Sequence, residues 1–261
     1  MRALRIAATG MQAQQMRVEV VSNNLANMNT TAYNARRAEF ADLHYQQLAR
    51  PGTVNAADGS LLPTGIQLGL GVRPAAVSMD VSQGAVEATG GELDVAIEGD
   101  GYIELVLPDG RSAYTRDGAL KRTGEGVMVN SDGFELAAGI TIPDETRAIS
   151  INAQGEVYAY FNDQVAPQQL GRIDLVSFAN DKGLEAIGGN LYLETEASGA
   201  PNAGEPGVDG RGTMRQGFLE ESSVDPVRQI TELIEAQRGY ELNAKVITAA
   251  DQMLGATSQI R

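Results

Sequence analysis

The sequence predicts a mainly β body, built as an antiparallel sandwich or barrel, with long N- and C-terminal α-helices that form a coiled-coil assembly domain. The terminal stretches 2–28 and 227–260 contain no proline and repeat apolar residues at every seventh position, as helices that pack on partner helices do. The stretch 51–210 holds 25 of the 30 glycines. Its short alternating segments, separated by Asp-Gly turns, are typical of antiparallel strands.

The first helix is expected over about residues 3–26. The last begins after Asp225 and Pro226, which suit an N-cap and a first helical turn. Each helix carries two lines of apolar residues at heptad spacing. In the first helix the lines are Leu4, Met11, Val18 and Leu25, and Ala7, Val21 and Met28. In the last helix they are Leu233, Tyr240, Ile247 and Leu254, and Ala236 and Ala250.

These lines fit a pair of helices within one chain, but the pair would be weakly apolar. Ala7, Gln14, Ala236, Asn243 and Ala250 are small or polar members of the same lines. Other faces are apolar as well, with Val246, Met253 and Ile260 in the last helix. A helix that is apolar on several faces must be covered on several sides. We therefore expect pairing within the chain and packing on neighbouring copies together.

The segment that follows the first helix is harder to interpret. Residues 35–48 fit a short helix or an extended chain, and residues 50–73 are interrupted by Gly and Pro, as in an exposed excursion. Within the excursion, Ile66, Leu68 and Leu70 alternate with other residues. This alternation predicts a strand or extended arm with one buried face.

The charge is unevenly distributed along the chain. The formal net charge is −14, and residues 51–210 carry eight basic and 24 acidic residues. Residues 1–50 have six Arg and three acids, and residues 211–261 have six basic and seven acidic residues. The excess of acidic residues lies in the β body, which would repel the phosphates of a nucleic acid, so no nucleic-acid partner is predicted.

Sites for chemistry are scarce in this sequence. His44 is the only histidine, so any His-based catalytic triad would have to use it. There is no cysteine, so a thiolate metal site is excluded. Asp109, Asp117 and Asp132 each precede a glycine, which a turn explains fully. We predict no catalytic, cofactor-binding or metal-binding residue. An enzyme with paired carboxylates that acts on peptidoglycan and a monomeric binding module are the alternatives from other classes.

No apolar run has the length of a signal peptide core or a membrane span. These residues alone predict a cytoplasmic protein, unless the chain is exported by a route that cleaves no signal.

Five motifs, in order, resemble the axial proteins of the bacterial flagellum, the family of rod, hook and hook-associated proteins. They are Ser22–Tyr33 (SNNLANMNTTAY), Asp94–Tyr102 (DVAIEGDGY), Tyr114–Gly118 (YTRDG), Asn190–Thr195 (NLYLET) and Ile234–Lys245 (IEAQRGYELNAK). Two positions depart from the family pattern: Ala32 stands where glycine is usual, and Asn34 where lysine is usual. Ala32 puts a positive-φ turn at this position in doubt.

Within the family, the length and the segment 45–69 resemble the distal rod, and the proximal rod is the alternative. The resemblance implies a structural subunit that leaves the cell by type III export without a cleaved signal and polymerises helically. The polymer would transmit torque across the periplasm and peptidoglycan to the hook. The implied partners are copies of the chain, the proximal rod and hook proteins, and the P-ring and L-ring proteins. Membrane embedding and cofactors are not implied.

The resemblance also implies three domains. Residues 1–35 and 218–261 would form the helical assembly domain, residues 36–75 an extended rod-specific segment, and residues 76–217 a β-rich outer domain. The assembly residues would be Leu4, Met11, Val18, Val21, Asn24, Leu25, Asn27, Leu233, Tyr240, Asn243, Ile247 and Leu254. The rod-specific residues would be Pro51, Gly52, Leu62, Pro63 and Gly65.

Overall fold

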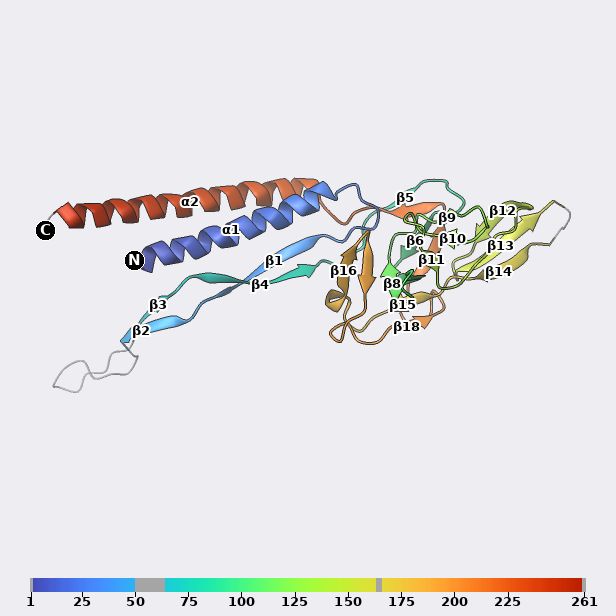
Figure 1. Ribbon diagram of the computed structural model, residues 1–261, viewed down its shortest axis with the longest axis horizontal. Helices are drawn as coiled ribbons and strands as arrows, with labels where there is room; N and C mark the ends of the chain where they lie inside the picture. Colours follow the sequence, from blue (N-terminus) through green and yellow to red (C-terminus); the bar gives the residue numbers. More distant parts are fainter. Residues whose placement is uncertain (1, 50–63, 163–165, 260–261) are drawn as a thin grey trace. The chain divides into compact units, whose positions relative to one another are not determined.

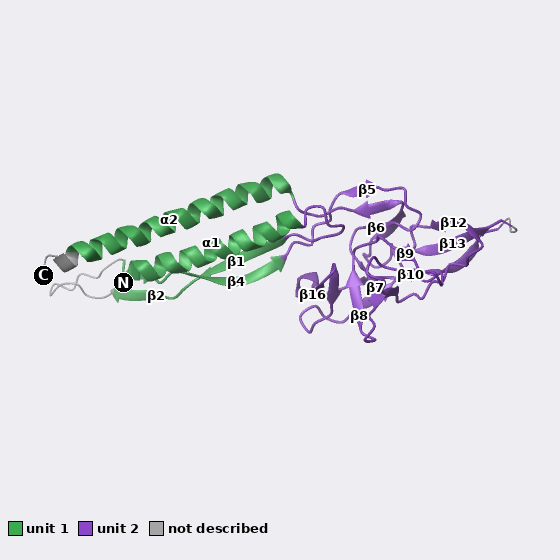
Figure 2. Ribbon diagram, turned by 45° about the horizontal axis from the view of Figure 1, so that its top comes forward, with its two compact units in different colours: residues 1–26, 36–78, 225–261 green, residues 27–35, 79–224 purple. Residues whose placement is uncertain are grey.

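The computed structural model describes residues 2–49, 64–162 and 166–259, and in it the chain divides into two compact units. The helical unit contains residues 1–26, 36–78 and 225–261, and the β unit contains residues 27–35 and 79–224 (Figure 2). Mainly β structure with a helix at each end is the fold that the sequence predicts. Assembly as a coiled coil between copies stays a prediction.

Two long helices run side by side in the helical unit (Figure 1). They are α1 (Arg2–Ala26) and α2 (Pro226–Gln259). The carboxylate of Asp225 accepts hydrogen bonds from the N–H groups of Val227 at 2.9 Å and Arg228 at 3.3 Å. This cap satisfies donors that the first turn of a helix leaves free, and it confirms the predicted start of α2.

The helical unit also contains two pairs of strands. They are β1 (Arg36–Asp42) with β4 (Val72–Met79), and β2 (Tyr45–Ala49) with β3 (Ile66–Gly69). The second pair is antiparallel, with Tyr45 opposite Gly69. Residues 36–42 and 45–49 are therefore extended, which resolves the choice that the sequence left open. The hydroxyl of Thr9 on α1 accepts a hydrogen bond from the N–H of Val72 at 3.3 Å, so β4 is tied to this helix.

The predicted strand at Ile66, Leu68 and Leu70 is only partly confirmed. Residues 66–69 form β3, but these three side chains are 56%, 44% and 40% exposed. No face of this strand is therefore buried within the single chain, and its burial against neighbouring copies stays a prediction. Pro51, Gly52, Leu62 and Pro63 lie outside the described residues, while Gly65 is half-buried.

The β unit is built from short antiparallel strands. Its largest sheet has nine strands and runs β16-β17-β8-β7-β11-β10-β9, and β15 pairs with both β7 and β18. The strands of this sheet are β7 (Tyr102–Val106), β8 (Ser112–Thr115), β9 (Lys121–Arg122), β10 (Met128–Val129), β11 (Glu135–Leu136), β15 (Leu175–Ser177), β16 (Glu185–Gly188), β17 (Leu191–Leu193) and β18 (Asn202–Gly204).

Smaller sheets complete the β unit. A three-stranded sheet has the order β12-β13-β14, and β19-β6 and β20-β5 are two-stranded. Their strands are β5 (Val86–Ala88), β6 (Val95–Glu98), β12 (Thr146–Ile151), β13 (Glu156–Phe161), β14 (Gln168–Arg172), β19 (Thr213–Gln216) and β20 (Phe218–Glu220). A 3-10 helix, η1 (Asp181–Gly183), follows β15.

Two of the three predicted Asp-Gly turns join neighbouring strands of the large sheet, whereas Asp117 and Gly118 lie between β8 and β9, which do not pair with each other over the described residues. Between β7 and β8, Gly110 has φ +81° and its N–H donates to the carbonyl of Leu107 at 2.9 Å. Gly133, with φ +88°, closes the turn between β10 and β11 in the same way, with Asn130 as acceptor. Glycine adopts this left-handed conformation without steric cost.

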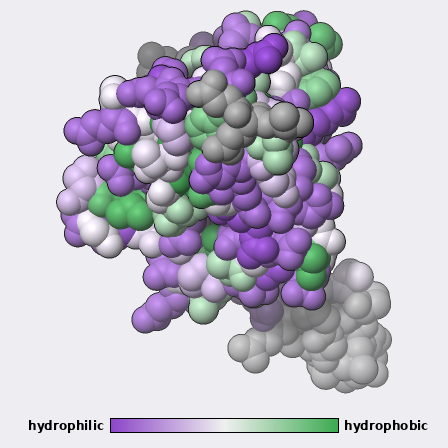
Figure 3. Space-filling view, turned by 90° about the vertical axis from the view of Figure 1, so that its right-hand side faces the viewer, coloured by the Kyte–Doolittle hydropathy of each residue, from purple (hydrophilic) through white to green (hydrophobic). Residues whose placement is uncertain are grey.

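Large apolar side chains fill the interior of the β unit. The main cluster of buried residues is Val95, Ile97, Ile103, Leu105, Leu107, Ala113, Leu120, Met128, Leu136, Ile140, Ile142, Ile151, Val157, Ile173, Leu175, Leu191 and Met214. The face of the molecule in Figure 3 is mainly hydrophilic, with hydrophobic residues scattered over it.

Ala32 keeps the turn that the sequence placed in doubt. Its φ is +54°, in the left-handed region that favours glycine, and its N–H donates to the carbonyl of Glu220 at 2.8 Å. The side chain is 2% exposed. The β unit therefore holds an alanine in a conformation that costs about 1–2 kcal/mol.

Candidate assembly surface of the helix pair

The surfaces by which α1 and α2 face each other consist of small and polar residues, here called the seam. The amide of Asn24 on α1 contacts Gln229 on α2, whereas Gly10 of α1 lies against Asn243, further along α2. The two helices are therefore antiparallel. The seam residues of α1 are Ala7, Gly10, Gln14, Val21 and Asn24, and those of α2 are Gln229, Ala236, Gly239, Asn243 and Ala250.

Two glycines let amide side chains into the seam. A Cβ atom on Gly10 would lie 2.9 Å from Oδ1 of Asn243. A Cβ atom on Gly239 would lie 3.0 Å from Cδ of Gln14. Both distances are shorter than van der Waals contact, so glycine on one helix matches an amide on the other.

Amides also provide the hydrogen bonds of the seam. The amide nitrogen of Asn24 donates to Oε1 of Gln229 at 3.1 Å and to the carbonyl of Arg36 at 2.7 Å. Asn243 donates within α2, to the carbonyl of Gly239 at 2.9 Å. Oε1 of Gln14 is buried without a hydrogen-bond partner among the described residues. A seam of this kind stabilises the pair weakly, because little apolar area is buried and one polar atom is unsatisfied.

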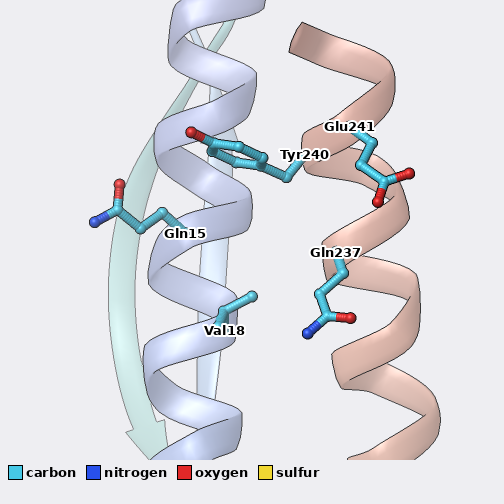
Figure 4. A pocket seen from close by; sticks show the side chains of 5 residues that line it. All are labelled: Gln15, Val18, Gln237, Tyr240 and Glu241. Atoms are coloured by element: carbon cyan, nitrogen blue, oxygen red, sulfur yellow. The ribbon is translucent and has the colours of Figure 1, made fainter.

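The line of larger residues predicted at heptad spacing lies beside the seam. Leu4, Met11, Val18, Leu25, Leu233 and Ile247 are half-buried. Tyr240 and Leu254, in the same line, are 44% and 45% exposed. Val18 and Tyr240 border a groove of about 510 Å³ between the helices, together with Gln15, Gln237 and Glu241 (Figure 4).

A second apolar surface lies on α2 and is exposed. We call it the outer face of α2, and its residues are Val227, Ile230, Ile234, Leu242, Val246 and Met253. The side chains of Val227, Leu242 and Met253 are 75%, 63% and 64% exposed. Exposed large apolar side chains in such number on one helix mark an interaction surface.

The structure therefore distributes the predicted assembly residues over two places. Val21, Asn24 and Asn243 lie in the seam, and the larger residues lie beside it, where Val18 and Tyr240 border the groove. Asn27 follows α1 and belongs to the β unit. The sequence reading missed Gly10, Gly239 and Gln229, although the heptad spacing of Gln229, Ala236, Asn243 and Ala250 could have identified the last of these.

Within the described ranges, no group of three or more His, Cys, Asp or Glu side chains could hold a metal ion. Neither helix, over its described residues, is long and apolar enough to cross a membrane.

Three protein-family profiles match the chain in order. They are the flagella basal body rod protein over residues 4–33, the flagellar hook protein FlgE/F/G D1 domain over residues 96–159, and the flagellar basal body rod FlgEFG protein C-terminal over residues 215–260. Among solved structures, the Helicobacter pylori flagellar hook protein FlgE2 matches 71% of this chain and 43% of its own, at 14% identity and a TM-score of 0.25, which is too low to bear on the fold.

Relatives match over the whole length. The flagellar basal-body rod protein FlgG of Caulobacter vibrioides is 49% identical, and the match covers 100% of both chains. Proteins of the same name from Agrobacterium fabrum and Borreliella burgdorferi are 45% and 43% identical, over 99% and 100% of this chain and 99% of each relative. None of these names denotes an enzyme. The chain therefore belongs to the flagellar basal-body rod protein family.

Proposed function

We propose that this chain is a structural subunit of the flagellar distal rod, which polymerises helically through its terminal helices. The observation that carries the proposal is the contrast within α2. Small residues and amides fill its seam with α1, while the larger residues of its outer face are exposed. Full burial of each large side chain would contribute about 1.5–3 kcal/mol, so contact with further copies is strongly favoured.

A second copy of the chain is the partner we propose for this face. The outer face of α2 and the groove at Val18 and Tyr240 lie on different parts of the helix pair, so one copy can offer a helix while another offers the groove. Contacts between two different surfaces of identical subunits generate open helical polymers when the rotation between copies does not close a ring. Such a polymer would serve as a drive shaft.

The paired strands β2 and β3 are a further proposed contact. Tyr45, Leu48, Ile66 and Leu68 are between 44% and 56% exposed. We propose that this arm, which is part of the rod-specific segment 36–75, lies against neighbouring copies and stiffens the polymer. The change of both Ile66 and Leu68 to Ser should then give filaments that bend more easily in electron micrographs. Unchanged bending stiffness would remove the arm from the proposal.

The wider setting follows from the proposed role in the rod. The partners would be the proximal rod and hook proteins along the axis and the P-ring and L-ring proteins around it. The rod would cross the periplasm, which the chain would reach by type III export without a cleaved signal. The domains 1–35 with 218–261, 36–75 and 76–217 would be assembly domain, rod-specific segment and outer domain. The proximal rod is the alternative, and no observation favours it.

The test compares two charged variants of α2. Leu242→Asp puts a carboxylate on the outer face, where desolvation would oppose assembly, and Gln252→Asp adds the same charge at an exposed polar position. In sedimentation and electron microscopy, we expect Gln252→Asp to polymerise like the wild type and Leu242→Asp to remain monomeric with normal unfolding of the β unit. In cells, only Leu242→Asp should abolish swimming.

Two results would contradict the proposal. If Leu242→Asp polymerises like the wild type, the outer face of α2 is not the assembly surface. If cells that lack this protein build complete rods and swim normally, the protein is not a rod subunit.

A further inference from the structure

A buried ion pair joins two distant parts of the β unit. The guanidinium of Arg116 and the carboxylate of Glu220 approach to 2.8 Å, and their side chains are 8% and 2% exposed. Nε and Nη2 of Arg116 both donate to Oε2 of Glu220, at 3.1 and 2.8 Å. Nη1 and Nη2 also donate to the carbonyls of Gly101 and Gly99, at 3.1 and 3.0 Å. Arg116 directly follows β8, and Gly99 and Gly101 belong to the loop before β7. The guanidinium is thus held in one orientation by Glu220 and by this loop.

Glu220 holds two further segments of the chain. Its other carboxylate oxygen, Oε1, accepts a hydrogen bond from the N–H of Gly84 at 3.0 Å. Its backbone carbonyl accepts the N–H of Ala32 at 2.8 Å. One residue therefore connects Arg116 in the interior of the β unit with the segments 27–35 and 79–86.

The chain enters or leaves the β unit at both ends of the segment 27–35, at the start of the segment 79–86, and after Val224, which follows Glu220 closely in the sequence. In sequence, the chain passes between the two units after residues 26, 35, 78 and 224. Hydrogen bonds connect the neighbouring residues of the β unit to one another. They are Ser223 N–H to Tyr33 carbonyl at 3.0 Å, Asp80 N–H to Ala35 carbonyl at 2.8 Å, Ala35 N–H to Ser223 Oγ at 2.9 Å, and Glu221 N–H to Ala85 carbonyl at 2.7 Å.

We infer that Glu220, held by Arg116, is a positioning residue that anchors all four chain passages to the interior of the β unit. The inference rests on the proposed rod function, because the covalent chain connects the helices with the β unit at these four passages. Glu220 and Arg116 make a forked, directional contact, which an apolar pair of the same volume would not provide. Buried ion pairs contribute little net stability, so position is the more suitable reason for this one.

A purely stabilising role makes a different prediction. If the pair only stabilised the fold, its loss would raise amide hydrogen exchange throughout the β unit. If the pair positions the passages, exchange should rise at Ala32, Gly84 and Glu221, while Leu105 and Val157 in the interior stay protected.

The experiment measures hydrogen exchange in the purified full-length chain. In Glu220→Gln, the side chain keeps its shape but has one acceptor oxygen, which cannot serve both Arg116 and Gly84. We expect exchange at Gly84 and Ala32 to rise by about tenfold or more. The matched control is Asp109→Asn, which breaks an ion pair with Arg111 that is exposed on the same unit; it should change neither amide. Should Glu220→Gln fail to fold, Arg116→Lys keeps the charge without the fork and should show the same local effect.

Two results would overturn the inference. In Glu220→Gln, exchange at Gly84 and Ala32 could be no faster than in Asp109→Asn, or exchange could rise uniformly across the β unit. In cells, Glu220→Gln should build rods but lose more swimming speed than the control as viscosity rises. If both variants lose the same swimming speed, the pair has no role in the transmission of torque. Normal swimming by cells without the protein would instead overturn the rod function, and it would leave the exchange result standing.

Discussion

The helical unit and the β unit differ in the size of the side chains that they bury. Among the described residues, the largest fully buried side chains all belong to the β unit, and they include Tyr114, Ile103 and Leu105. The helix pair buries alanines, one valine and amides, and leaves large apolar residues such as Leu242 outside. The β unit therefore has a complete interior of its own. In the helix pair the seam is covered, whereas the outer face of α2 is exposed in the single chain.

This difference indicates which unit can fold without contact to other copies of the chain. Burial of apolar area is the main favourable contribution to folding, so a unit that buries large side chains can fold as a monomer. A pair of helices with a seam of small residues gains little from pairing alone. We expect its order to increase when copies assemble.

The first prediction compares a truncation in each unit. Leu105→Ala should lower the free energy of unfolding of the β unit by about 2–5 kcal/mol, because Leu105 is fully buried and its loss leaves a cavity. Ile234→Ala, on the 45% exposed Ile234, should change monomer unfolding by less than about 0.5 kcal/mol. Urea unfolding followed by tyrosine fluorescence measures both. A large loss for Ile234→Ala would mean that the outer face of α2 is already covered in the monomer.

The second prediction overfills the seam of the helix pair. Ala236 is fully buried, so Ala236→Leu should push α2 away from α1 at a cost of about 1–3 kcal/mol. Circular dichroism at 222 nm should then show loss of helix at a lower temperature. Ala249→Leu is the matched control, because Ala249 is exposed on the same helix. If the two variants melt alike, α1 and α2 do not pair through this seam in solution.

The third prediction concerns the strained alanine of the β unit. Ala32→Gly relieves a positive φ that costs about 1–2 kcal/mol, and loses about 0.8 kcal/mol from one buried methyl group. The net gain in unfolding free energy should be up to about 1 kcal/mol, measured by urea unfolding. Ala113→Gly removes a methyl group that is equally buried in β8, where φ is not positive, and should be destabilising. A loss of stability in both variants would contradict the strain at Ala32.

The fourth prediction is a pH dependence in the β unit. Burial raises the pKa of the Asp117 carboxyl above its usual range, and the nearby Asp132 and Asp94 add to the effect, while a hydrogen bond from the Ala119 N–H opposes it. The folded state therefore favours the protonated carboxyl, which contributes to stability at low pH. The wild type should lose this stability as the pH rises from the usual carboxyl pKa through the raised one.

Asp117→Asn has no charge to bury and keeps an acceptor for the Ala119 N–H. It should be more stable than the wild type at neutral pH, and the difference should disappear in acid, below the usual carboxyl pKa. Thermal unfolding at several pH values measures the difference. A gap that stays constant with pH would show that Asp117 does not titrate in the folded chain as proposed.

Local patterns in the sequence predicted the elements well. The heptad spacing indicated both helices, and Asp225 before Pro226 indicated the start of α2. The Asp-Gly pairs at Asp109 and Asp132 indicated turns that the structure contains. Each of these signals is contained within a few residues, where hydrogen bonding and φ preferences of the chain decide the structure.

Contacts between distant residues could not be predicted in the same way. Asn24 meets Gln229 across 205 positions, and Arg116 meets Glu220 across 104. The hydrophobicity of the heptad lines favours Leu and Met over Ala as the inner line, but the small residues are inside because they permit a closer approach of the helices. The exposure of Ile66 in the arm could not be predicted either, because alternation in the sequence indicates an apolar face of a strand but does not tell what covers it.

The amides of the seam have one more consequence, which concerns alignment. Along α2, amide and alanine alternate every seven residues, from Gln229 through Ala236 and Asn243 to Ala250. If α2 slipped by one heptad, Asn24 would face an alanine instead of Gln229, and a buried amide would lose its bond to the partner helix. A slip by two heptads would bring Asn243 to Asn24 but would leave half the seam without a partner. The polar residues of the seam thus add little to the strength of pairing, but they favour one alignment of α1 and α2, and this alignment sets how far α2 extends beyond the seam.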